Sequence, residues 1–212
     1  LYDYAEDAES EEDAIEDYPV TLFLSQHGYF KKITPQSLRM SGEQKFKEDD
    51  ALSMSVESSN AAELMFFTDK AQVYKTRASD FADGKASQLG DYLPAKLGMD
   101  EGESVMGMVL PGDYSGYMIF FFENGKAAKV ELSAYKTTSN RRRLTGAYSD
   151  KSPLKALLHL KEDREIAVYS TEPRVLIVNT ALLGVKTTRT TQGVALLTLK
   201  KKYVLDTVRF PE

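Results

Sequence analysis

Basic side chains recur at similar places in four successive stretches of this chain, and they are its strongest chemical signal. Lysine or arginine follows a tight turn in most stretches and appears again in the loop beyond it. Such a series suits a phosphate backbone, because each neutralised phosphate releases counterions and every contact adds affinity. Contacts to phosphate rather than to base edges would give little sequence preference. The residues expected to make them are Lys31, Lys32, Arg39, Lys75, Arg77, Lys129, Arg141, Arg142, Arg143, Lys186 and Arg189.

Residue types that usually carry catalysis are sparse. The chain has no cysteine, which excludes disulfides, thiolate chemistry and cysteine-bound metals. His27 precedes a turn glycine and His159 lies in an apolar run, so both are interpreted as turn or packing residues. The acidic run Glu9–Asp17 lacks the glycine and the alternating oxygen ligands of a calcium loop. We therefore expect no catalytic residue, metal or cofactor, and an enzyme that uses Asp or Glu in a central channel is the least favoured alternative.

The charge of the chain is divided unevenly. Residues 1–18 hold nine acidic residues and no basic one, which leaves a net charge of +4 on residues 19–212 once the arm's −9 is taken from the total of −5. The acidic arm is either a solvated linker or a segment that competes with a polyanion for the basic body. No apolar run approaches 18 residues and no signal peptide is recognisable, so we expect a cytoplasmic protein without a membrane partner.

The basic residues are placed by a repeated pattern of apolar run, tight turn and second run. The turn positions Gly28, Ala71, Gly125 and Pro173 are 43 to 54 residues apart. An apolar residue follows each by ten positions, at Leu38, Phe81, Tyr135 and Leu183, and a glycine comes next, at Gly42, Gly90, Gly146 and Gly193. A period of this length is typical of a propeller or a solenoid.

Each repeat reads as a β-hairpin with at least one further strand, and helix is expected at most in 92–99 and 154–162. The further strands are predicted at 51–56, 104–110, 154–160 and 203–208. Four small sheets cannot bury their faces alone, so stacking them predicts an all-β, propeller-like fold of about four blades. The predicted organisation is an acidic arm, 1–18, then one domain, 19–212, with repeats at about 19–60, 61–112, 113–162 and 163–212. A last strand ending at Val208 could close the ring on the first repeat.

The first hairpin resembles a known family. Val20–Ser25 followed by Gly28-Tyr29-Phe30-Lys31-Lys32-Ile33 looks like the first blade of the C-terminal domain of bacterial type IIA DNA topoisomerase A subunits, those of DNA gyrase and topoisomerase IV. Phe67–Lys75 and Gly102–Val105 match later blades of that pattern, and the resemblance covers residues 19–208. It implies a β-pinwheel, in which neighbouring blades exchange strands, that binds and bends duplex DNA on a basic rim. It also implies that the chain is not an enzyme alone, and that its partners on the nucleoid are an ATPase B subunit and the catalytic core of its own A subunit.

One departure from the family separates its two branches. Gyrase carries a Gln-Arg-Arg-Gly-Gly-Lys-Gly box after the first hairpin, and the matching stretch here is Arg39–Lys45, which keeps one glycine and one lysine. The resemblance therefore favours a topoisomerase IV-like subunit. Four repeats are fewer than the family usually has, so the ring is expected to be open, incomplete or smaller. A propeller-like scaffold whose basic sites face an acidic protein is the alternative.

Overall fold

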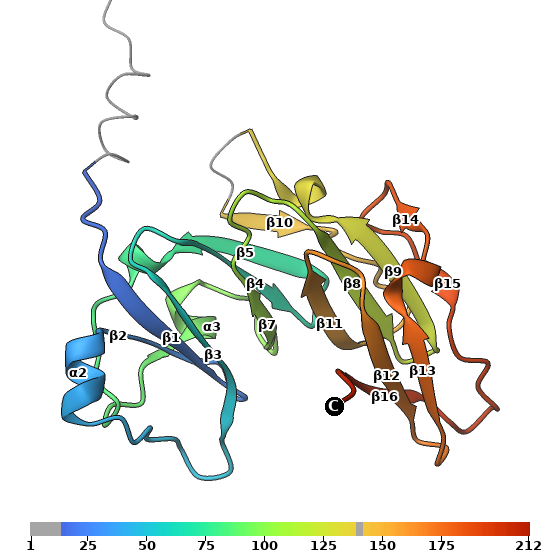
Figure 1. Cartoon of the computed structure of the whole chain (residues 1–212), viewed down its shortest axis with the longest axis horizontal. Helices are drawn as coiled ribbons and strands as arrows, with labels where there is room; N and C mark the ends of the chain where they lie inside the picture. The colour runs from blue at the N-terminus through green and yellow to red at the C-terminus, as the bar shows by residue number, and fades with distance from the viewer. Residues whose placement is uncertain (1–13, 139–141) are drawn as a thin grey trace, which may run out of the picture. The chain divides into compact units, whose positions relative to one another are not determined.

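Strands account for most of the regular structure in this computed structural model, which describes residues 14–138 and 142–212 (Figure 1). The strands of the described residues form four sheets, and the few helices are short, so the all-β prediction is confirmed. The chain divides into two compact units. Unit 1 is Leu1–Leu64 with Thr76–Leu110, and unit 2 is Met65–Lys75 with Pro111–Glu212. Arg141 and residues 1–13 of the acidic arm lie outside the described residues.

The first sheet belongs to unit 1 and is built on the predicted hairpin. Its strands, in spatial order, are β3 (Leu52–Ser59), β1 (Pro19–Ser25), β2 (Tyr29–Ile33) and β6 (Asp91–Tyr92). Gly28 makes the β1–β2 turn with a φ of +89°, a conformation that favours glycine. Leu24 pairs with Phe30 across the hairpin, and both side chains are buried. The alternation of apolar residues along β1 thus places one face of the sheet in the core.

The second sheet and the helical turns follow. The sheet has the order β10 (Arg143–Thr145), β5 (Gln72–Arg77), β4 (Glu63–Thr68) and β7 (Val105–Val109). Helix α3 (Leu93–Lys96) falls within the predicted range 92–99. Helix α2 (Pro35–Met40) was not predicted, although Thr34 caps it by accepting a hydrogen bond from the Ser37 amide and Pro35 opens it. Short 3₁₀ turns, η1 (Ala78–Asp80), η2 (Leu132–Tyr135) and η3 (Thr180–Leu182), directly follow the hairpins of the second, third and fourth sheets.

Unit 2 contains the third and fourth sheets. The third sheet has the order β11 (Leu154–Leu160), β8 (Tyr117–Phe122), β9 (Lys126–Glu131) and β14 (Val185–Lys186), and β15 (Val194–Ala195) also pairs with β9. The fourth sheet has the order β13 (Val175–Asn179), β12 (Glu165–Ser170) and β16 (Leu205–Arg209). Ile119 and Phe121 of the third sheet pack against Ile166 and Val168 of the fourth in one buried cluster. The two sheets are therefore held face to face by apolar side chains.

Two structural expectations need correction in unit 2. The last strand, β16, pairs antiparallel with β12 of its own repeat, so the expectation that it closes the ring on the first repeat is wrong. The strand predicted at 154–160 is confirmed as β11 beside β8, so the helical turn that was also allowed in 154–162 is replaced there by a strand. Both outcomes follow from pairing between apolar strands, which local propensity does not specify.

The marker glycines let short strands approach the preceding hairpin. Gly193 precedes β15, which pairs with β9, and has a φ of +74°. A Cβ at this position would lie 1.9 Å from the carbonyl oxygen of Ala127. Gly90 holds the same place before β6, where a Cβ would lie 2.4 Å from the carbonyl oxygen of Phe30. These glycines are therefore required by close backbone approach between successive repeats.

Replacing Gly193 by alanine should lower the thermal unfolding midpoint by several degrees. The side chain would be forced both into a left-handed backbone conformation and against the β9 backbone, at a cost of about 1–3 kcal/mol. Gly184→Ala is the matched control, because an added Cβ there meets nothing within 4 Å. Equal midpoints for the two variants, measured by circular dichroism, would contradict the requirement for glycine.

Candidate nucleic-acid interface

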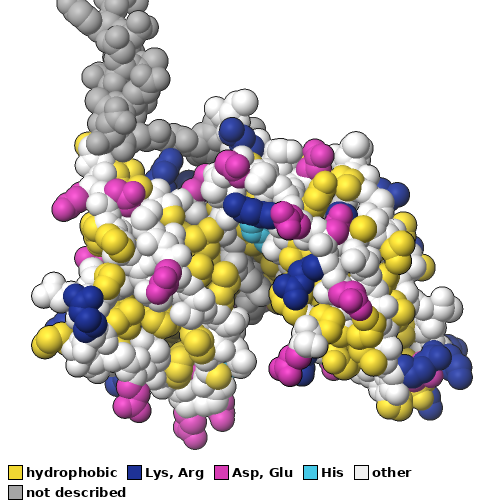
Figure 2. All heavy atoms as spheres, in the orientation of Figure 1, with side chains coloured by type: hydrophobic (Ala, Val, Ile, Leu, Met, Phe, Trp, Pro, Cys, Tyr) yellow, Lys and Arg dark blue, Asp and Glu magenta, His cyan; other side chains and the backbone are white. Residues whose placement is uncertain are grey.

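Charged side chains on the face of the molecule in Figure 2 form separate groups. Lysine and arginine side chains lie beside aspartate and glutamate side chains there, rather than in one continuous basic band. The predicted phosphate contacts therefore have to be judged one residue at a time, by what each basic group binds.

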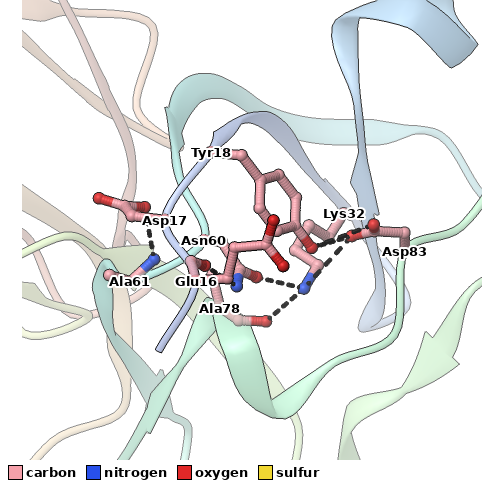
Figure 3. Close-up of polar contacts among 8 residues, drawn as sticks. All are labelled: Glu16, Asp17, Tyr18, Lys32, Asn60, Ala61, Ala78 and Asp83. Atoms are coloured by element: carbon pink, nitrogen blue, oxygen red, sulfur yellow. Dashed lines mark hydrogen bonds and ion pairs between the residues drawn. The ribbon is translucent and has the colours of Figure 1, made fainter. Parts of the chain in front are cut away.

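Lys32 is enclosed by polar groups inside unit 1 (Figure 3). Its side chain is 2% exposed, and its Nζ donates to Asn60 Oδ1 at 2.6 Å and to the carbonyl oxygen of Ala78 at 3.1 Å. Asp83 forms an ion pair with Nζ at 3.4 Å and also accepts a hydrogen bond from the Tyr18 hydroxyl. Burial and the Asp83 carboxylate raise the pKa of Tyr18 to about 12. The Lys32 amine thus has its partners within the protein.

The end of the acidic arm lies on the same cluster (Figure 3). The Asn60 side-chain amide donates to the carbonyl oxygen of Glu16 at 2.8 Å, and the Ala61 amide donates to Asp17 Oδ1 at 3.0 Å. Asn60 therefore binds Lys32 with its oxygen and the arm with its nitrogen, and the arm joins the first sheet at the Lys32 cluster.

Lys129 of the third sheet repeats this arrangement in unit 2. Its side chain is 3% exposed, and its Nζ lies 2.7 Å from Asp163 Oδ1 and 3.1 Å from the carbonyl oxygen of Thr180. It also lies 4.6 Å from the centre of the Tyr117 ring. Hydrogen bonds from Lys129 and Thr180 hold the pKa of Asp163 below its usual value. The Lys129 amine thus also has its hydrogen-bond partners within the protein.

The same kind of hydrogen bond links each of the first three repeats to the repeat that follows it. Lys32, Lys75 and Lys129 each lie four residues after the aligned turn position, and each donates to a carbonyl in the 3₁₀ turn of the following repeat. The acceptors are Ala78 of η1, Tyr135 of η2 and Thr180 of η3. We call Lys32, Lys75 and Lys129 the bridging lysines. They are assigned a structural role in place of the predicted phosphate contact.

Lys31 is likewise bound internally. Its Nζ donates to the carbonyl oxygens of Lys45, Ala86 and Gln88 at 3.3, 3.2 and 3.0 Å. Burial of the amine lowers the pKa of Lys31, because the charged form loses solvation. Lys31 is not a bridging lysine, but it is assigned a structural role for the same reason.

The predicted arginines divide between half-buried and exposed positions. Arg77 and Arg189 are half-buried, and each donates from Nη1 to a backbone carbonyl, that of Ala61 at 3.1 Å and that of Ala134 at 3.0 Å. Arg39, Arg142 and Arg143 are exposed. Arg143 donates from Nε to Gln72 at 2.6 Å, which fixes the side chain. A guanidinium remains fully charged when it bonds to a protein group, so an exposed arginine with internal bonds still attracts phosphate.

Two segments of unit 2 carry basic residues without any acidic residue, 132–149 and 173–205. The described basic residues in them are Lys136, Arg142, Arg143, Arg174, Lys186, Arg189, Lys200, Lys201 and Lys202. The two segments touch, since Arg189 binds the carbonyl of Ala134 and a Cβ on Gly146 would lie 3.5 Å from Thr190. We call 136–138 and 142–145 together with 184–193 the basic loops. Sequence reasoning missed Lys136, which the absence of acidic neighbours could have identified.

Neither a metal site nor a membrane span is found in the parts of the chain that the structure describes. No three His, Asp or Glu side chains are placed there to hold an ion, and no helix is long and apolar enough to cross a bilayer. His159 on β11 is half-buried, and burial lowers its pKa. The candidate interface consists of the cations of the basic loops, which include the short strands β10 and β14.

Comparisons with solved structures identify the fold. The C-terminal domain of DNA topoisomerase IV aligns over 92% of this chain and 62% of its own, with a TM-score of 0.80 and 20% identity. The DNA gyrase A C-terminal domain aligns over 90% of this chain and 64% of its own, with a TM-score of 0.59 and 15% identity. The fold is therefore that of a propeller-like β domain, as the repeats predicted.

Sequence comparisons point to the same relatives. A family model described as the DNA gyrase C-terminal domain, beta-propeller, matches residues 62–88. The DNA gyrase A protein of Mycoplasma pneumoniae is 30% identical over 143 residues, 64% of this chain and 17% of the relative. The DNA topoisomerase 4 A protein of Staphylococcus epidermidis is 29% identical over 157 residues, 71% of this chain and 20% of the relative. The predicted resemblance to the C-terminal domain of type IIA topoisomerase A subunits is confirmed, and the chain spans about a fifth of the length of these relatives.

Proposed function

We propose that the chain is a non-catalytic domain that binds and bends duplex DNA within a type IIA topoisomerase. The observation that carries this proposal is the pair of basic loops, which are acid-free and adjoin each other on the fold of such a domain. Arginine and lysine on loops bind phosphate oxygens without reading the bases, so the domain would hold duplex of any sequence. In the cell, its partners would be an ATPase B subunit and the catalytic core of its own A subunit, on the nucleoid in the cytoplasm.

The topoisomerase IV-like branch is favoured over gyrase. The stretch Arg39–Lys45 lacks the double arginine and the glycine pair of the gyrase box, and its first residues complete helix α2. The TM-score is also higher against the topoisomerase IV domain than against the gyrase domain. We therefore propose that the domain positions and bends DNA for strand passage without wrapping it chirally.

A salt titration of duplex binding tests the function. Fluorescence anisotropy with a labelled duplex of about 30 base pairs should give an affinity whose logarithm falls linearly with the logarithm of salt concentration. A second sample without residues 1–13 removes most of the arm's acidic side chains, so that they cannot mask binding. No binding by either sample at low salt would overturn the proposal and favour a protein-interaction scaffold.

Bending needs its own measurement. Ligation of duplexes of about 150 base pairs, near the persistence length, should give more small circles in the presence of the domain. If the logarithm of DNA affinity falls linearly with the logarithm of salt concentration but the yield of circles does not rise, the domain binds DNA without bending it.

A further inference from the structure

We propose that the outer face of the fourth sheet binds the same face of a second copy of this chain. This outer face consists of Ala167 and Tyr169 on β12 with Val175 and Ile177 on β13, which are direct neighbours across the hairpin. Tyr169, Val175 and Ile177 are 36%, 49% and 48% exposed. The opposite face, with Ile166 and Val168, packs on the third sheet, whereas the outer face exposes Tyr169, Val175 and Ile177 around Ala167, which is buried.

The equivalent face is buried in other hairpins of the chain. In the third repeat the same positions hold Ile119, Phe121, Ala127 and Lys129, and all four are buried. In the first repeat they hold Leu22, Leu24, Phe30 and Lys32, which are also buried. This position in the repeat therefore belongs to an interface between stacked sheets. An exposed apolar face at such a position marks an interaction site.

The residues of the outer face identify what covers it. A bridging lysine lies at this position in the first three repeats and donates to the 3₁₀ turn of the next repeat, but Ile177 has no donor. A further repeat stacked in the same way would leave its carbonyl without that hydrogen bond, which disfavours it as the occupant. A second copy would present Ile177 to Ile177 and would bring no 3₁₀-turn carbonyl that requires a lysine donor there.

Charge at the margins of the outer face also fits a second copy. Glu165 lies at one margin and Arg209, which pairs with Ala167 across β12 and β16, lies at another. Both side chains are exposed. A face that carries one charge of each sign is complementary to itself when two copies meet about a twofold axis. The Arg209 guanidinium lies 5.6 Å from the centre of the Tyr169 ring, so this charge borders the apolar part of the face directly.

The association should be weak. Three partly exposed apolar side chains offer less area than the roughly 800 Å² per partner of a standard stable interface. We therefore expect a dimer that forms only as the protein concentration rises into the range of tens of micromolar and above. Analytical ultracentrifugation of the 212-residue chain should show the weight-average mass increase toward that of a dimer.

A cysteine crosslink provides the sharper test, because the chain has no cysteine of its own. Ile177→Cys should form a disulfide-linked dimer under mild oxidation, since the two side chains face each other at the twofold axis. Leu52→Cys is the matched control, a side chain 44% exposed on β3 of unit 1. Crosslinking of Ile177→Cys no faster than that of Leu52→Cys would overturn the proposal.

Charge substitution completes the test. Ile177→Lys restores the residue type of the other repeats and should abolish self-association, because two copies would bring like charges together. Leu52→Lys adds the same charge elsewhere and should leave it intact. A monomer at every concentration for the unmodified chain, or equal effects of the two lysines, would reject the outer face as a self-association site. None of these measurements involves DNA, so they stand apart from the proposed function.

Discussion

Replacing Lys129 by methionine is expected to lower the free energy of unfolding by about 2–4 kcal/mol. Methionine fills a similar volume but cannot donate, so the Thr180 carbonyl and the Asp163 carboxylate lose the amine that they share. The upper values for broken buried ion pairs do not apply, because Asp163 is 36% exposed and water partly replaces its partner. Lys161→Met, on an exposed lysine of the same unit, should change stability by less than about 0.5 kcal/mol. Urea denaturation of the two variants measures the difference.

The acid response of the Lys129→Met variant provides a second readout. Lys129 depresses the pKa of Asp163 in the folded protein, so the pair contributes stability above the unfolded pKa of aspartate and loses it as pH falls through the folded value. The difference in stability between wild type and variant should therefore shrink on acidification below that value. NMR titration should also show the Asp163 pKa rising toward its usual value in the variant. An unchanged pKa together with unchanged stability would mean that Lys129 is not a bridging lysine.

The bridging lysines mark the limit of what the sequence could reveal about the site. A basic residue four positions after each of the first three turns is visible as a repeated feature, and it was interpreted as a phosphate contact because a series of cations suits a phosphate backbone. The direction in which each lysine side chain points depends on a carbonyl in the next repeat, about 50 residues away, and no local sequence pattern encodes that contact. Ile177 is the informative exception, because it breaks the lysine series where the outer face is exposed. The presence of isoleucine in place of lysine at this position could have suggested that the lysines of the other repeats are buried.

More of the fold than of the candidate site could be predicted from the sequence. Turn glycines such as Gly28 and Gly125, set between apolar runs, predicted the hairpins, since a positive φ at those positions is a local requirement. Helix α2 was missed because six residues carry little periodicity, and its Thr34-Pro35 start was the one available signal. The partner of β16 could not be assigned, because strand pairing is decided by packing between distant segments.

Neutralising three bases of the basic loops is expected to have the largest effect on DNA binding. The variant Arg142→Gln, Arg143→Gln and Lys186→Gln removes three cations from the acid-free segments. Each phosphate contact contributes about 0.9 to the slope of log affinity against log salt, so the slope should fall by about 2 to 3. At about 0.1 M salt the same three contacts correspond to a loss of roughly a hundred-fold or more in affinity. Gln keeps a polar, uncharged group on a shorter side chain, and an unchanged thermal midpoint confirms that the fold is retained.

A matched control separates local contacts from net charge. Lys70, Lys151 and Lys161 are exposed in the same unit, and each is next to an acidic residue in the sequence: Asp69, Asp150 and Glu162. Changing these three to Gln alters the net charge by the same amount but removes cations whose field a neighbouring carboxylate already offsets. The slope should therefore remain close to that of the unmodified chain. Equal losses in the two triple variants would mean that DNA responds to total charge alone, and no loss in either would place the interface away from the basic loops.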